Sequence, residues 1–130
     1  MKIFAEIFLI VALAAFSGPK TLKGTWSYVG GIYNGKKEGA PTGYSLRRKY
    51  SDTTFEAFVI DKGSKPEKFE SGYYFLKSDT CIETETYSAQ PSKLTGHPVN
   101  YHYEIRKDSL IFSGRLPTGM IIEEYWKRVK

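Results

Sequence analysis

The stretch "LKGTW", residues 22–26, stands between an apolar leader and a series of short segments that have the composition of β-strands. It places a glycine, one spacer and a tryptophan at the start of the first of these segments, residues 25–33. Asn34-Gly35 then marks a tight turn. The stretch therefore marks where the folded part of the chain begins, and it predicts that this part opens with a strand.

Seven more segments continue the pattern to the end of the chain. Turn residues separate them, such as "KSD" at 77–79 and the two-residue "KD" at 107–108. No segment has a sustained 3.6-residue apolar period, and Tyr and Phe, which favour strands, are abundant at ten and eight. Short strands with regular turn signals predict a β-sandwich or a β-barrel. The expected strands cover residues 25–33, 44–50, 54–60, 69–76, 80–87, 99–106, 109–115 and 120–129.

The leader has the layout of a secretory signal peptide. Residues 3–16 are apolar except for Glu6, and small residues around Ser17 suit cleavage before Gly18. We expect residues 1–17 to be the signal peptide and residues 18–130 to be one barrel domain, with no membrane span after cleavage. Cys81 is the only cysteine, so no internal disulfide can form. An exported chain without disulfides suggests a secreted or periplasmic protein of a bacterial envelope.

Alternation predicts which side chains face inward. In "VNYHYEI" at 99–105 the apolar face holds Val99, Tyr101, Tyr103 and Ile105. Two other strands have mixed faces. Glu83 shares a face with Cys81, and Glu124 shares one with Trp126. Inward carboxylates would suit a lined cavity, because burying them in a solid core costs several kcal/mol unless they are paired. Outward charges on a solvated face explain the pattern equally well, and which face of the strand at 81–87 points inward stays open.

Four motifs resemble a known family. Gly24-x-Trp26 with an arginine in the last strand resembles the signature of calycins, the group that includes lipocalins and fatty-acid-binding proteins. The wider pattern resembles a family of small lipocalin-like proteins exported by Bacteroidetes. It is carried by "LKGTW", "SGYYFLKSDTCIETETYS", "LTGHPVNYHYEIRKDSLIFSG" and "EEYWKRVK", and it covers nearly all of residues 22–130. The resemblance implies a single antiparallel up-and-down β-barrel of about eight to ten strands.

The resemblance also implies roles for single residues. Trp26 would plug one end of the barrel and Arg128 would lie across its ring, where a cation gains roughly 0.5 to 2 kcal/mol. Tyr74, Glu83, Glu124 and Trp126 match the family pattern as well. Cys81 departs from it, where the family has an aromatic residue, and Glu85 stands where an apolar residue is more usual. The family brings no defined activity to this chain.

Motifs for catalysis, cofactors and metals are absent from the sequence. It has no P-loop, no dinucleotide fingerprint, no HExxH and no Cys/His cluster for zinc. We therefore expect no catalytic residue, cofactor or metal. A Cys-His pair built on Cys81 is a poor candidate, because a lone buried cysteine is usually a small apolar residue. Glu83 and Glu124 could act as a general acid/base pair, as in glycosidases, and this is the weaker alternative.

The chain carries a formal net charge of +5, with short basic runs at 47–49 and 127–130. Export makes nucleic acid a poor candidate partner, and charge of this size aids solubility or weak attraction to anionic surfaces. We expect a binding protein for a small amphipathic or hydrophobic ligand. The alternative is a scaffold whose rim loops bind or inhibit another protein. The candidate cavity residues are Arg48, Phe55, Tyr74, Glu83, Tyr101, Tyr103 and Glu124.

Overall fold

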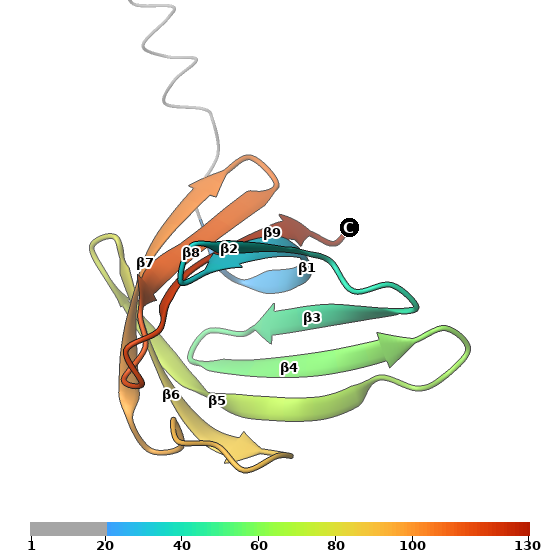
Figure 1. Cartoon of the computed structure of the whole chain (residues 1–130), viewed down its shortest axis with the longest axis horizontal. Coiled ribbons are helices and arrows are strands. Elements are labelled where there is room, and N and C mark those ends of the chain that lie inside the picture. Colours follow the sequence, from blue (N-terminus) through green and yellow to red (C-terminus); the bar gives the residue numbers. More distant parts are fainter. Residues whose placement is uncertain (1–20) are drawn as a thin grey trace, which may run out of the picture.

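The computed structural model describes residues 21–130, which form nine antiparallel strands (Figure 1). The expected signal peptide lies outside the described residues. No helix within 21–130 is long and apolar enough to cross a membrane. The strands are β1 (Gly24–Tyr33), β2 (Lys36–Gly39), β3 (Tyr44–Tyr50), β4 (Thr54–Asp61), β5 (Glu67–Lys77), β6 (Thr80–Ser88), β7 (Pro98–Arg106), β8 (Ser109–Arg115) and β9 (Ile121–Arg128).

Eight of these strands form a closed barrel. Each strand from β3 to β9 pairs with the next, and β1 pairs with both β3 and β9. Trp26 is opposite Arg128 in the β1–β9 register, so the first and last strands close the sheet. The prediction of an all-β antiparallel barrel is confirmed, and the architecture is consistent with that of lipocalins and fatty-acid-binding proteins.

The ninth strand, β2, is an addition that the sequence pattern did not predict. Its four residues are all exposed. The first half of β1, up to Ser27, pairs with β3, whereas the second half, from Gly30 to Tyr33, pairs with β2. Asn34 and Gly35 have positive φ values of 50° and 83°, the geometry of the hairpin turn that joins β1 to β2. Because β2 takes the place of β3 beside β1, one end of the barrel is less tightly closed.

Three irregularities in pairing change which side chains face inward. The registers skip Val29 between β1 and β9, Phe69 between β4 and β5, and Thr86 between β5 and β6. Each is a bulge, in which one extra residue shifts the alternation of the strand by one position. Before the Val29 bulge the inward-facing residues are Trp26 and Tyr28. After the bulge the side chains at odd-numbered positions of β1 face inward.

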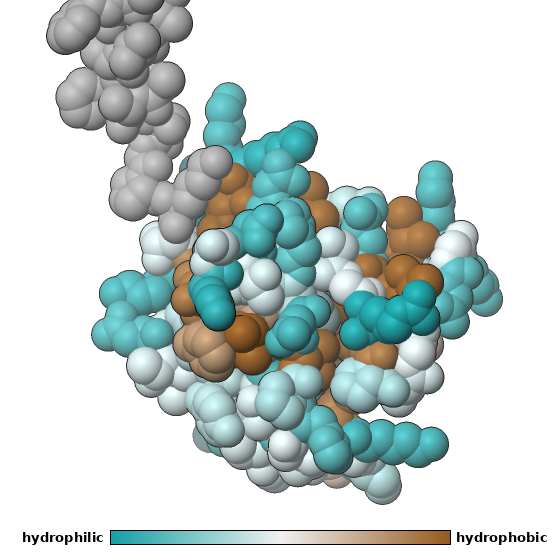
Figure 2. Space-filling view, turned by 90° about the vertical axis from the view of Figure 1, so that its left-hand side faces the viewer, coloured by the Kyte–Doolittle hydropathy of each residue, from teal (hydrophilic) through white to brown (hydrophobic). Residues whose placement is uncertain are grey.

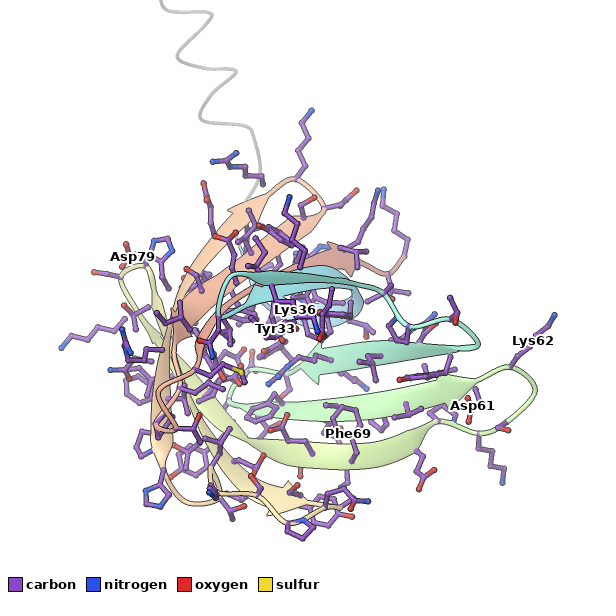
Figure 3. All side chains as sticks on the ribbon, viewed as in Figure 1. Tyr33, Lys36, Asp61, Lys62, Phe69 and Asp79 are labelled. Atoms are coloured by element: carbon purple, nitrogen blue, oxygen red, sulfur yellow. The ribbon has the colours of Figure 1, made fainter. Side chains whose placement is uncertain are left out.

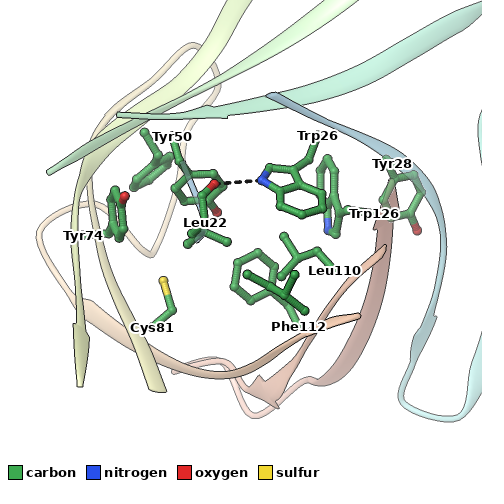
Figure 4. Packing of buried hydrophobic residues seen from close by; sticks show 11 residues of the cluster. Leu22, Trp26, Tyr28, Tyr50, Tyr74, Cys81, Leu110, Phe112 and Trp126 are labelled. Carbon is green, nitrogen blue, oxygen red and sulfur yellow. Dashed lines mark hydrogen bonds between the residues drawn. The ribbon is translucent and has the colours of Figure 1, made fainter. Parts of the chain in front are cut away.

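Residues 22–26, "LKGTW", form the closed end of the barrel. Trp26 is fully buried, and its Nε1 donates a hydrogen bond to the Leu22 carbonyl at 2.9 Å (Figure 4). Arg128 lies over the ring, with its guanidinium carbon 4.1 Å from the centroid, and donates to the carbonyls of Thr21 and Lys23. Gly24 has φ +121°, and a Cβ there would lie 2.9 Å from the Arg128 guanidinium. Glycine is therefore required where the arginine crosses the strand.

Apolar side chains fill the half of the barrel behind this plug. They come from both ends of the sequence and pack around Tyr50, whose ring is 5.0 Å from that of Tyr74 in an edge-on contact (Figure 4). On the face shown in Figure 2, hydrophilic side chains alternate with small apolar areas. The buried cluster is made of Leu22, Trp26, Tyr28, Tyr50, Phe55, Tyr74, Cys81, Ile105, Leu110, Phe112 and Trp126.

Candidate functional site

The other half of the barrel contains a hollow of about 370 Å³. It lies between strands β1, β2 and β9 on one side and strands β3 to β5 on the other. Two of its lining residues, Tyr33 and Phe69, are labelled in Figure 3. A hollow of this size suits one small molecule. It is lined by Tyr28, Tyr33, Glu38, Gly39, Pro41, Tyr44, Leu46, Arg48, Ala57, Phe69, Glu70, Glu124 and Trp126.

Arg48 lies at the boundary between the filled half and the hollow. Its side chain is only 13% exposed, and it pairs with Glu83 at 2.6 Å and with Glu70 at 3.5 Å. Its guanidinium also lies 4.7 Å from the ring centroid of Phe55. Burial acts to lower the pKa of Arg48, but the combined attraction of Glu83, Tyr50, Glu70 and Tyr101 outweighs it and raises the pKa above the usual value. The guanidinium is therefore charged and held by the protein itself.

Glu83 lies beneath Arg48, on the side of the filled half. Both of its carboxylate oxygens are engaged: Oε1 accepts from Arg48, and Oε2 accepts from the Tyr50 hydroxyl at 2.5 Å. The thiol of Cys81 approaches Oε2 at 3.9 Å. A buried carboxylate is stabilised by partners of this kind. This geometry gives Glu83 a structural role beneath the hollow.

A second pair of carboxyl groups lies at the wall between β5 and β6. Burial raises the pKa of Glu70 to about 8, against the opposing attraction of Arg48, and a hydrogen bond with Glu85 raises it further. Burial also acts to raise the pKa of Glu85, but hydrogen bonds with Glu70, Ser92 and Thr95 together lower it. At neutral pH Glu70 is therefore the protonated member of the pair, and its carboxyl O–H donates a hydrogen bond to the Glu85 carboxylate.

The opposite wall carries a chain of hydroxyl groups that ends on Glu124. The Tyr33 hydroxyl donates to Glu124 Oε2 at 2.8 Å, and the Tyr28 and Tyr33 hydroxyls are 2.6 Å apart. Because Tyr33 uses its one proton toward Glu124, Tyr28 must donate to Tyr33. Gly31 makes this contact possible, since a Cβ there would lie 2.8 Å from the Tyr33 hydroxyl.

The structure brings two of the seven candidate cavity residues, Arg48 and Glu124, into the lining of the hollow. Glu83 and Phe55 lie next to Arg48 but inside the packed interior. Tyr101 is half-buried on β7 and packs on Phe112, with ring centroids 5.4 Å apart. These three residues support the floor of the hollow and do not line it.

Tyr74 and Tyr103 lie away from the hollow, toward the closed end. Tyr74 packs in the filled half, and its hydroxyl donates to the Ser51 carbonyl. Tyr103 donates to the Ser78 carbonyl at 3.3 Å, in the β5–β6 turn. That turn carries Asp79, which lies on the far side of the molecule from Asp61 and Lys62 (Figure 3). Neither Tyr74 nor Tyr103, both expected as cavity residues, lines the hollow.

Several lining residues were missed because bulges moved them. Strict alternation from Trp26 places Tyr33 outside, but the Val29 bulge turns it inward. The Phe69 bulge brings two consecutive residues, Phe69 and Glu70, to the hollow. Gly30-Gly31 inside a strand is a signal for a bulge, so the first shift was open to prediction. Neither Phe69 nor Glu70 has a comparable signal in the sequence.

Neither Cys81 nor His102 lines the hollow. Burial raises the pKa of the Cys81 thiol well above its usual value, so the thiol stays protonated in the packed half. His102 lies on the outer face, where it contacts Asp79 at 3.2 Å. No group of three or more metal-ligating side chains occurs within the part of the chain from 21 to 130.

Comparison with known proteins adds no family to these observations. No protein-family model matches the sequence, and no curated protein matches it significantly.

Proposed function

We propose that this protein binds a small amphipathic molecule in the open half of its barrel and performs no chemistry on it. The observation that carries the proposal is the hollow of about 370 Å³, which combines aromatic and apolar walls with a few convergent polar groups. That combination is typical of small-molecule sites. The packed half supports it, because rigid walls lower the entropic cost of ordering a site.

The wider setting of the proposal comes from the sequence. We propose that the chain is exported to the bacterial envelope or beyond, on the strength of the leader at residues 1–17. Its motifs support a relation to the small lipocalin-like proteins of Bacteroidetes. A role for Glu83 in catalysis has little support, because both of its oxygens are already bound by Arg48 and Tyr50.

A dye-binding experiment tests the proposal. Nile red is uncharged and fluoresces more strongly in apolar surroundings, so the wild type should bind it saturably at one site. Leu46 lines the hollow, and Leu46→Trp should fill the space and weaken binding by about 10-fold, since side-chain volume then competes with the dye.

The matched control is Ile121→Trp, which makes the same kind of enlargement at a position that is 52% exposed. It should leave dye affinity unchanged. If the wild type shows no saturable binding, or both variants bind as the wild type does, the ligand proposal is wrong. The scaffold alternative, with rim loops that bind another protein, then takes its place.

A further inference from the structure

The hollow has more acidic than basic groups in its walls. Glu38, Glu70 and Glu124 line it, whereas Arg48 is its only arginine or lysine within residues 21–130. Arg48 is already committed to Glu83, with a nitrogen-to-oxygen distance of 2.6 Å. A ligand with a carboxylate head would therefore meet no free cation, and it would face repulsion from Glu38 and Glu124, the wall carboxylates other than the protonated Glu70.

Glu124 is the carboxylate that remains available to a ligand. Glu70 is bound to Glu85 and shares Arg48, and Glu38 lies on the exposed strand β2. Glu124 is half-buried and accepts one hydrogen bond, from Tyr33. No lysine or arginine of the described chain lies within ion-pair distance of it. A half-buried carboxylate with no cation beside it attracts a cationic ligand more strongly than an exposed carboxylate does, because less water screens the pair.

The apolar walls favour the same kind of ligand. Five aromatic side chains line the hollow, and the faces of aromatic rings attract cations, more strongly where water is excluded. The indole of Trp126 is 6% exposed and comes from the same strand as Glu124, two residues further on. A cationic head at Glu124 would therefore lie beside aromatic rings, with space for an apolar body along the rest of the hollow. The five aromatic residues are Tyr28, Tyr33, Tyr44, Phe69 and Trp126.

We infer that the ligand is an organic cation with an apolar body, a protonated amine or a quaternary ammonium, whose head pairs with Glu124. This inference rests on the proposed function. It runs against the net charge of the whole chain, +5, which by itself would favour anions. The local arrangement decides the preference, because salt screens exposed charges beyond about 8 Å at physiological ionic strength, whereas Glu124 would be in direct contact with the head group.

A series of ligands with one apolar body and different heads tests the inference. Octylamine, octyltrimethylammonium, octanol and octanoate would each compete with Nile red at neutral pH. The two cations should bind about 10-fold more tightly than octanol, and octanoate should bind most weakly. Glu124→Gln keeps the size of the side chain and removes its charge. In this variant the affinity for the two cations should fall to within about 2-fold of the affinity for octanol.

Glu123→Gln is the matched control, because it makes the same change on the same strand at a residue that does not line the hollow. It should keep the preference for cations. Tightest binding of octanoate or octanol to the wild type would overturn the inference and leave the proposed function standing, and the wild-type series decides this even if Glu124→Gln does not fold. An unchanged preference in folded Glu124→Gln would also overturn it. Failure of Nile red and all four compounds to bind would overturn both.

Discussion

The two halves of the barrel interior are built by the same strands, yet one is packed and the other is hollow. In the packed half Trp26, Phe55 and Leu110 are each no more than 1% exposed. In the hollow half Leu46 and Phe69 are only half-buried and face open space. The difference follows from pairing: β3 lies beside β1 at the closed end, and the short hairpin strand β2 replaces it at the open end.

A layer of charge separates the halves. Arg48 and Glu83 come from β3 and β6, across the barrel from each other in strand order, and their ion pair spans the interior. Replacing such a pair by apolar side chains is often neutral for stability, whereas removing one partner leaves a buried charge and costs much more. The packed half therefore sets most of the stability, the hollow half is the proposed binding site, and the charged layer contacts both.

The largest effect is expected at the closed end. Trp26→Ala should lower the free energy of unfolding by roughly 3–5 kcal/mol, because it removes a fully buried ring and leaves a cavity. It also removes the surface on which Arg128 lies. Urea-induced unfolding followed by circular dichroism would measure the loss. A loss below about 1 kcal/mol would mean that the two halves do not differ in packing as described.

An intermediate effect, dependent on pH, is expected at the boundary. The pKa of Glu70 is about 8 in the folded protein, against an ordinary value of 4.5. Between these values the folded state binds the proton and the unfolded state does not, so the stability of the wild type should fall as pH rises from about 5 to 8. Below this window the group is protonated in both states and contributes nothing to the slope.

Glu70→Gln should remove that slope, because the amide can donate to Glu85 at every pH. Between about pH 5 and 8, the free energy of unfolding of the variant should therefore rise relative to that of the wild type by roughly 1–3 kcal/mol. This value is reduced because the side chain is partly exposed. Thermal unfolding at several pH values would measure the gain. Glu67→Gln, at an exposed position of the same strand, is the control and should leave the slope in place. If the stability of the wild type and that of Glu70→Gln change in parallel with pH, Glu70 does not carry the proton.

The smallest effect on stability is expected in the hollow. Phe69→Ala should cost less than about 1 kcal/mol, because the ring is half-buried and its removal enlarges a space that is already open. Binding of Nile red should weaken more visibly, by about 3-fold or more, because the ring is part of the wall. If Phe69→Ala destabilises the barrel as much as Trp26→Ala does, the hollow half is as tightly packed as the other.

The sequence predicted the strands well, because turn residues mark most of their ends. It failed where the evidence for a strand or a face is not local. The strand β2 has four exposed residues with no apolar alternation, so only the positive-φ turn at Asn34-Gly35 points to it. The faces of β5 and β6 depend on where bulges fall, and a bulge shifts every later side chain to the other face.

The site was partly within reach of sequence reasoning. Inward carboxylates at Glu83 and Glu124 were inferred from mixed strand faces, and both side chains point into the barrel. Their roles differ because of partners that no local pattern specifies: Arg48 binds Glu83, 35 residues away, and Tyr33 binds Glu124, 91 residues away. Such pairs depend on strand order and register, which the sequence does not express in neighbouring residues.

The pairing of β1 with β9 has a consequence for how the chain reaches its fold. Trp26 cannot meet Arg128 until the last strand is present, so barrel closure is a late event that joins segments about 100 residues apart. Long loops of this kind carry a large entropic cost before any contact compensates it, and barrels accordingly fold in milliseconds to seconds. Until closure, β1 and β9 are bare edges that another chain could pair with. The tryptophan that seals the barrel thus gains its arginine only after the last strand has joined the sheet.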